Sequence, residues 1–440
     1  PGVTGHRRPR VPVPLLVARR LALLGGTTTW GDCAAAARLL AGGDDLVDGP
    51  ALAAYERAFA ERVGVSRAVS FAHGRVALYG ILRALGVGPG DDVLVPLPTH
   101  VVVANAVRYT GATPVFVDCR ADSWNVDLDH AEELVSERTR ALLLQHTFGT
   151  PADIDRAVEL GARHGIEIVE DCVHALGARH GGRPVGGFGR AAFFSTEETK
   201  TISSTMGGMA ATDDPALAAS LRAFQAACTP PGQWLAARYV LKLLSYHVLT
   251  QPPLHRYTRP VYERRGRRNP LPGPTTVEER RGERPDDFEQ RLSNGQAVLA
   301  LRQLDRLDEN VAHRRRIACV YARRLGALGG GPPALLDGDA AALVRYPVRV
   351  ADRDAAVRAI AAVAVPGLWF TSVLEESETP AHGGYVDGTC PVAEEAARHL
   401  VNLPTHPRVR DDDAERIADA VAAAMPAAAP SVIPQAVGAR

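Results

Sequence analysis

The sequence predicts an α/β protein with a mostly parallel central sheet flanked by helices and a smaller α+β C-terminal domain. Between about residues 50 and 215, short apolar runs recur, and helical stretches such as RVALYGILRALG and IDRAVELGARHG separate them. The runs expected to be strands are AVSFA, DVLVP, TPVFVD, ALLLQH, EIVEDC and AAFFST. Apolar strands that alternate with helices are typical of a parallel sheet covered on both faces.

Composition limits the classes of function. The chain has 440 residues, 46% of them hydrophobic and 23% charged, and its formal net charge is zero. This size suits a two-domain enzyme, and the balanced charge gives no basic field that would favour nucleic acid. No apolar run reaches the ~20 residues of a membrane span. The six cysteines form no CxxC pair, so we expect reduced thiols, no metal site and a cytoplasmic setting.

Changes in composition along the chain suggest five parts. We expect a lead-in arm over 1–45 rather than a signal, a large α/β domain over 46–228, and a Pro/Arg-rich insertion over 229–285. A small domain follows over 286–425, with a long amphipathic helix through RLSNGQAVLALRQLDRLDENVAHRRRIACVYARRL, a strand LVRYPVRV, and a helix AEEAARHLVNLP entering a turn. The tail 426–440 is expected to be disordered. The insertion could lie on the surface or across a dimer interface, cover an anionic substrate, or contact a membrane surface through 230–268.

Lysine usage singles out one position. Only Lys200 and Lys242 are lysines, so 48 of the 50 basic Lys and Arg residues are arginine. An amine that condenses with a carbonyl must lose its proton, which lysine can do and arginine cannot. Lys200 is therefore the candidate nucleophile, the alternative being a solvated lysine retained by chance. Lys242, in the insertion, is expected to lack a polar constellation.

A Schiff-base lysine indicates pyridoxal phosphate (PLP), and this cofactor makes further demands. Asp171, at the end of the EIVEDC run, could keep the ring nitrogen protonated, although it could instead cap a helix at VHALGA. A strand-to-helix turn at Gly74, with Arg75 beside it and the Ser195 hydroxyl, could bind the phosphate. His100 could stack on the ring, although a lone histidine is more often structural.

Four extended segments in order resemble the DegT/StrS-like sugar aminotransferases, a fold-type I PLP family. The segments are VGPGDDVLVPLPTHVVVANAVRYTGATPVFVDC, VEDCVHALGARHGGRPVGGFGRAAFFSTEETKTISSTMGGMAATDD, RLSNGQAVLALRQLDRLDE and LVNLPTHPRV. The resemblance runs from about residue 50 to 425. It implies a homodimer with shared sites, an amino-acid donor such as L-glutamate, and a nucleotide-linked keto-sugar as the acceptor.

The resemblance also assigns roles to residues. Lys200 takes the Schiff-base position, Asp171 the pyridine-nitrogen position, and His174 a position near the phenolic oxygen. Ser195 corresponds to a phosphate ligand, Gly74 and Arg75 replace the family's Gly-Thr, and His100 takes the stacking position. Glu289 stands where the family usually has an Asn that reaches the neighbouring subunit's phosphate, and Met206 replaces part of GEGG. A carboxylate would repel that phosphate.

Two other functions remain open, and a third is disfavoured. The acceptor could be a keto-cyclitol or another natural-product ketone. The chain could also be a catalytically silent PLP-fold binding or regulatory protein. Related dehydratases carry His at the lysine position, so Lys200 argues against them.

Overall fold

The computed structural model describes residues 20–43, 45–268, 274–326 and 340–425, without the side chains of 262–268. Residues 1–19 of the predicted arm and the predicted tail 426–440 lie outside the described residues.

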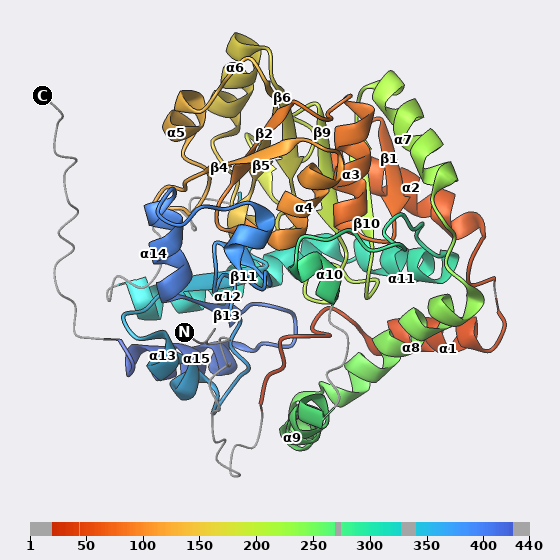
Figure 1. Ribbon diagram of the computed structural model, residues 1–440. Helices are drawn as coiled ribbons and strands as arrows, with labels where there is room; N and C mark the ends of the chain where they lie inside the picture. The colour runs from red at the N-terminus through yellow and green to blue at the C-terminus, as the bar shows by residue number, and fades with distance from the viewer. Residues whose placement is uncertain (1–19, 44, 269–273, 327–339, 426–440) are drawn as a thin grey trace, which may run out of the picture.

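A seven-stranded sheet forms the centre of the large domain (Figure 1). In spatial order its strands are β1 (Arg67–Phe71), β10 (Gly208–Thr212), β9 (Ala191–Ser195), β6 (Glu167–Asp171), β5 (Thr139–Gln145), β2 (Asp92–Pro96) and β4 (Thr113–Val117). All six predicted strands are present, and the parallel pairing of β9, β6, β5, β2 and β4 confirms the predicted class. β10 was not predicted. It runs antiparallel to both β1 and β9.

Helices cover both faces of this sheet. They are α2 (Pro50–Val63), α3 (Gly74–Ala84), α4 (Val101–Tyr109), α5 (Leu128–Glu133), α6 (Ile154–His164) and α7 (Pro215–Ala227). Alternate strand residues enter different cores: Leu142 packs in the cluster with α2 and α6, whereas Leu143 packs in the cluster with α3, α4 and α7. This alternation explains why the strands read as continuous apolar runs.

The arm and the insertion pack on each other. The arm contains α1 (Trp30–Leu40), and the insertion contains α8 (Gln233–Leu249), α9 (Pro252–Arg268) and the short α10 (Val277–Arg280). Ala36 and Leu39 of α1 meet Val240 and Leu243 of α8 in a small core cluster. In Figure 1, α9 lies at the lower edge, away from the sheet. Within the described ranges, no helix has the length and apolar character needed to cross a membrane.

The C-terminal part contains α11 (Asn294–Leu304), α12 (Leu307–Leu325), β11 (Arg345–Arg349), α13 (Arg353–Ile360), α14 (Pro391–His399), β13 (Leu400–Pro404) and α15 (Asp411–Ala422). A separate core lies between α12, β11, α13, β13 and α15, whereas α11 packs in the core cluster of the large domain. β11 pairs with β13 in antiparallel register. Two further pairs consist of two-residue strands: β3 (Thr99–His100) pairs with β12 (Leu374–Glu375), and β7 (Arg179–His180) pairs with β8 (Arg183–Pro184).

Two predictions for this part are wrong. The expected long helix is divided into α11 and α12, because the Arg306 N–H bonds to the Gln303 carbonyl in a tighter i→i−3 turn. The apolar positions continue through the buried Leu304 and Leu307, so the periodicity gives no sign of the break. The expected turn after the helix at 391–399 is instead the strand β13, whose Val401 pairs with Val348.

Candidate active site

Lys200 lies on the loop that joins β9 to β10. Its N–H donates to the Glu197 carbonyl (3.0 Å). A glycine pair, Gly207 and Gly208, closes the loop, since β10 begins beside the start of α3. A Cβ atom on Gly208 would lie 2.3 Å from the His73 carbonyl carbon and 2.5 Å from the Gly74 nitrogen. The second glycine, Gly208, is therefore required by a close backbone approach.

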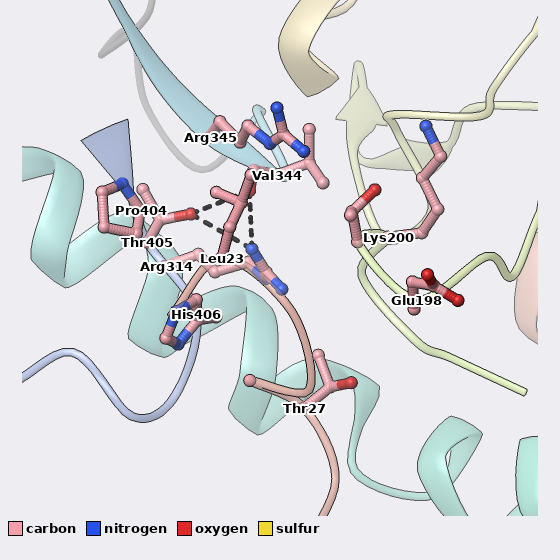
Figure 2. A pocket seen from close by; sticks show the side chains of 12 residues that line it. Leu23, Thr27, Glu198, Lys200, Arg314, Val344, Arg345, Pro404, Thr405 and His406 are labelled. Carbon is pink, nitrogen blue, oxygen red and sulfur yellow. Dashed lines mark hydrogen bonds between the residues drawn. The ribbon is translucent and has the colours of Figure 1, made fainter. Parts of the chain in front are cut away.

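Lys200 is one of the residues that line a small pocket (Figure 2). Its Nζ is 4.1 Å from the centre of the Trp369 ring. Burial lowers the pKa of Lys200 to about 8, and Arg345 acts in the same direction, whereas Glu197 and Asp171 oppose it. A lysine in this state exchanges its proton near neutral pH.

Asp171 ends strand β6 at the carboxyl edge of the sheet and is 2% exposed. Its Oδ1 accepts the Val173 N–H (3.1 Å), but this bond closes a turn. The predicted helix at VHALGA is absent, since residues 173–177 form turns, so Asp171 is not a helix cap. Burial raises the pKa of Asp171 to about 6, against the effects of the Val173 N–H and of Lys200.

His174 is held between two aromatic rings near Lys200. Its ring stacks on Trp369 at 4.6 Å and 18°, and lies 6.2 Å from Phe148 at 12°. Its Nδ1 is buried and has no hydrogen-bond partner in the described part of the chain. Burial lowers the pKa of His174 well below its usual value, so the ring is neutral. A buried polar atom without a partner is costly unless a ligand completes it.

The start of α3 offers an anion-binding position. No side chain in the described ranges caps this helix, which has eleven residues. A Cβ on Gly74 would lie 3.2 Å from the Cβ of Ser195, so the hydroxyl and the helix terminus are neighbours. Helix N-terminal N–H groups together with a hydroxyl suit a phosphate.

Lys200, Asp171 and His174, with Gly74 and Ser195 at the helix terminus, fit the functional groups of PLP: an amine, a carboxylate, an unsatisfied imidazole and a phosphate position.

Two predicted cofactor residues are engaged by other groups. Arg75 Nε forms an ion pair with Glu279 Oε1 (2.7 Å), and its Nη2 donates to the Pro274 carbonyl (2.9 Å). His100 Nδ1 accepts the Val102 N–H (3.3 Å) at the start of α4, and its Nε2 lies 3.7 Å from Glu376 Oε2. A phosphate contact of Arg75 and ring stacking by His100 therefore remain predictions.

Two acidic residues form ion pairs within the chain. Glu289, expected near the partner's phosphate, is bound by Arg284. Lys242 pairs with Glu198 Oε2 (3.0 Å), so the expectation that Lys242 lacks polar surroundings is wrong. Through this pair, α8 contacts the loop that carries Lys200. The expectation was wrong because the insertion folds as a helix that packs beside this loop, and the sequence alone did not predict that contact.

Sequence reasoning missed two site residues, Trp369 and Arg345. Trp369 lies outside the helices and strands, and its only sequence signal is the rarity of tryptophan, of which the chain has four. Arg345 is the first residue of the strand β11. Because the chain has 48 arginines, nothing in its sequence distinguished this one. Its guanidinium carbon is 3.4 Å from the Trp369 ring centre.

A buried cluster of His146, Glu170 and Cys172 has donor atoms at metal-ligand spacing. Hydrogen bonds account for it. Glu170 accepts the N–H groups of Gly186, Phe188 and Gly189 (2.7–2.8 Å), and His146 Nδ1 accepts the Ala152 N–H (3.0 Å). His146 Nε2 then donates to Glu170 (3.2 Å), so this cluster holds loops together.

The sheet with one reversed strand, and the lysine and carboxylate at its edge, define a PLP-dependent aminotransferase of fold type I. The chain belongs to the DegT/DnrJ/EryC1/StrS aminotransferase family, whose model matches residues 31–246 and 267–422. This confirms the resemblance read from the sequence.

Two curated relatives and one solved structure illustrate the likeness. GDP-perosamine synthase of Caulobacter vibrioides is 30% identical over 375 residues, covering 83% of this chain and 88% of the relative. UDP-N-acetyl-3-dehydro-alpha-D-glucosamine 3-aminotransferase of Acidithiobacillus ferrooxidans is 30% identical over 360 residues (81% and 84%). DesV of S. venezuelae, solved in complex with a ketimine intermediate, superimposes with a TM-score of 0.69 at 30% identity (94% and 98%).

Proposed function

We propose that this chain transfers an amino group from an amino acid, L-glutamate, to the ketone of a nucleotide-linked sugar. The observation that carries the proposal is that Lys200, on the β9–β10 loop, and the buried Asp171, at the end of β6, lie close enough for each charge to favour the other. The named activities of the relatives, a perosamine synthase and a 3-dehydro-glucosamine aminotransferase, support a keto-sugar as the acceptor. Secondary-metabolite or surface-sugar biosynthesis would use such a product.

Each residue has a task in this reaction. Bound PLP supplies an electron sink that accepts the electron pair left when a substrate carbon loses a proton. Asp171 would hold the proton on the ring nitrogen, His174 would donate or accept a hydrogen bond at Nδ1, and the start of α3 with Ser195 would bind the phosphate. Lys200, as a neutral amine, takes the proton from the donor's α-carbon and later returns a proton on the acceptor side.

The site is closed on one side by aromatic rings. Trp369 and Phe148 flank His174 and exclude water from that side. Exclusion of water keeps Lys200 and Asp171 in the protonation states that the transfer needs.

We also propose a homodimer in the cytoplasm. Exposed apolar side chains on α1 and α8, Trp30 (64%) and Trp234 (74%) among them, support a partner surface. Free thiols, with Cys33, Cys119, Cys172, Cys228 and Cys390 buried, support a reducing compartment. Sedimentation equilibrium of the cofactor-loaded chain tests the dimer.

The test of the function is a transamination screen. Purified protein with PLP and L-glutamate is offered nucleotide-linked 3-keto- and 4-keto-sugars and a set of keto-cyclitols, and 2-oxoglutarate and the aminated product are measured by mass spectrometry. Amination of a nucleotide-linked keto-sugar supports the proposal, and preference for a cyclitol would replace the acceptor. A chain that binds PLP but responds to no amino donor would be a binding protein.

A further inference from the structure

The helix α9 of the insertion is strongly basic. Its 17 residues include six arginines and one acidic residue, Glu263, so its formal net charge is +5. Because the whole chain has a formal net charge of zero, the remainder carries −5. In Figure 1, α9 lies at the lower edge of the molecule, away from the sheet. This separation of charge would turn the molecule so that α9 faces an anionic surface.

Apolar side chains of α9 are exposed along one side of the helix. Leu254, Tyr257 and Val261 are 39%, 58% and 60% exposed, and their i, i+3, i+7 spacing places them on the same side. Pro252 and His255, which lie on the other side of the helix, are buried. α9 therefore packs on the chain with one side and presents an apolar stripe to its surroundings.

The end of α8 enlarges this apolar surface. Val248 and Leu249, in its last turn, are 40% and 47% exposed. The Thr258 hydroxyl donates to the Leu249 carbonyl (2.7 Å), which holds α9 against the end of α8. We call the five exposed apolar residues at this junction the α8–α9 corner: Val248, Leu249, Leu254, Tyr257 and Val261.

Basic residues accompany the apolar ones. The guanidinium carbon of Arg256 is 4.4 Å from the centre of the Tyr257 ring, and its Nη2 donates to the Tyr257 hydroxyl. An arginine can lay its aliphatic stem along apolar neighbours while its guanidinium reaches water or a phosphate. Arginine together with tyrosine, leucine and valine on one helix is typical of helices that lie in the interface of a bilayer.

Charge distinguishes between the possible occupants of the α8–α9 corner. A second copy of this chain, packed through the same corner about a two-fold axis, would bring one basic α9 against another. A nucleic acid would use the arginines but leave the leucine and valine side chains without a partner. A bilayer with anionic lipids offers phosphates for the arginines and an acyl boundary for the apolar side chains.

We propose that the α8–α9 corner docks this protein on a bilayer surface rich in anionic lipids. α9 lies parallel to that surface, with Leu254, Tyr257 and Val261 at the boundary between the headgroups and the acyl chains. The corner does not include Trp30 and Trp234, which support the proposed dimer contact. Docking needs neither cofactor nor substrate, so its test is independent of the aminotransferase function.

Co-sedimentation with vesicles tests the docking. The full chain is mixed with vesicles of phosphatidylcholine alone, or of phosphatidylcholine with phosphatidylglycerol, at about 0.1 M and about 1 M salt. At the lower salt, binding to the anionic vesicles should be at least about 10-fold tighter than binding to the neutral ones. Most of this difference should disappear at the higher salt, because salt screens the arginines. Equal binding to both kinds of vesicle would overturn the proposal.

Two variants separate the apolar contribution from the charge. Leu254→Ser/Tyr257→Ser/Val261→Ser should weaken binding to anionic vesicles about 10-fold or more, because it removes the apolar stripe. Arg256→Gln/Arg259→Gln should weaken it about 10- to 30-fold at the lower salt. Circular dichroism and the unfolding temperature establish that both variants are folded. Unchanged binding by either variant contradicts the proposal.

Matched controls remove the same kinds of side chain elsewhere. Val158→Ser/Val386→Ser replaces two exposed valines, of which Val158 lies on α6 at the opposite end of the view in Figure 1. Arg57→Gln/Arg323→Gln removes two exposed charges on α2 and α12. Both controls should bind anionic vesicles as the parent chain does. Losses equal to those of the corner variants would mean that the attraction is general and that the corner is not the docking surface.

Hydrogen exchange of the parent chain gives a readout that needs no variant. Anionic vesicles should slow the exchange of amides within residues 246–261 and leave those of α6 unchanged, and protection that spares 246–261 overturns the proposal. Sedimentation equilibrium and binding of a single-stranded oligonucleotide identify the other occupants. If the parent chain ignores vesicles, a corner variant that becomes monomeric makes the corner a subunit contact, and oligonucleotide binding makes it a nucleic-acid site. Each of these results refutes docking on a bilayer.

Discussion

The amine of Lys200 lies 4.1 Å from the centre of the Trp369 ring, and the same ring also contacts the Arg345 guanidinium (3.4 Å) and stacks on His174 (4.6 Å). One indole therefore fixes three polar groups of the site. A cation–π contact with a partly desolvated ammonium contributes about 1–2 kcal/mol. We expect Trp369→Leu to lower kcat about 10-fold, because Lys200 loses its fixed position, and Trp369→Phe to retain most of the activity.

Steady-state kinetics of the keto-sugar reaction measure this effect. Trp234→Leu is the control, since Trp234 is 74% exposed on α8 and touches none of these groups. Equal kcat in Trp369→Leu and Trp234→Leu would mean that the indole does not position the lysine.

The two lysines of the chain allow a direct test of the covalent site. After addition of PLP and reduction with borohydride, a pyridoxyl group should appear on the peptide that carries Lys200. Lys200→Arg keeps the charge but cannot form the bond, so no label should be found. Lys242→Arg keeps the pairing with Glu198 and should be labelled like the parent chain. Peptide mapping by mass spectrometry that places the label on Lys242 would contradict the assignment.

The lowered pKa of Lys200 predicts a pH dependence. Burial disfavours the charged ammonium, so the pKa falls from 10.5 to about 8 in the folded chain. The rate of acetylation of Lys200 by acetic anhydride in apo-protein should therefore rise with pH to half its maximum near pH 8. In urea, where the chain is unfolded, the midpoint should move up toward 10.5. A midpoint that urea leaves unchanged would show that the fold does not shift this lysine.

The six predicted strands and the role of Lys200 could be inferred from the sequence because each has a local signal. A buried parallel strand needs a continuous apolar run, and Lys200 contrasts with the arginines around it. The strand β10 was not predicted, because its sequence GMAAT has only one large apolar residue. Its glycine is present because the strand begins close to the backbone at the start of α3. The break between α11 and α12 escaped because the apolar periodicity continues across it.

The missed site residues depend on contacts between distant parts of the chain. Arg345, Trp369 and Lys200 come together only when the small domain packs beside the β9–β10 loop, and no local spacing encodes a contact between residues 145 and 169 positions apart. The ion-pair partner of Arg75 likewise could not be predicted, since Glu279 lies 204 positions away in the insertion. Local chemistry was predictable, but charge pairing across the fold was not.

The Arg75–Glu279 pair predicts how the cofactor affects stability. Glu279 is 1% exposed and compensates Arg75 at the start of α3, where the phosphate is expected. Glu279→Gln should destabilise the apo-protein by about 3 kcal/mol, because it leaves a buried charge unpaired. A phosphate that meets Arg75 would restore the compensation. PLP should therefore raise the unfolding temperature of this variant more than that of the parent chain.

Glu278→Gln is the control. Glu278 is next to Glu279 in the sequence, but its carboxylate is exposed and does not pair with Arg75. An equal gain from PLP in all three chains would show that Arg75 stays with the insertion and does not face the phosphate.

Asp171 predicts opposite effects on stability and activity. The pKa of its carboxyl is raised from 3.8 to about 6 by burial, so the folded chain favours the protonated form. The preference for the protonated carboxyl stabilises the fold fully below pH 3.8, and this contribution is lost as the pH rises through about 6. Above that pH the folded chain carries a buried charge, which lowers the free energy of unfolding by up to about 3 kcal/mol relative to low pH. Asp171→Asn removes that cost and can still accept the Val173 N–H. The apo-variant should thus unfold at a higher temperature than the parent chain at pH 7.5, and the difference should shrink toward pH 4.

Its turnover should fall roughly 100-fold or more, since an amide cannot hold the ring nitrogen protonated. Calorimetry at both pH values and kinetics at pH 7.5 measure the two effects, with the exposed Asp155→Asn as control. A variant that is less stable at pH 7.5 would mean that the Asp171 carboxylate is compensated in the fold.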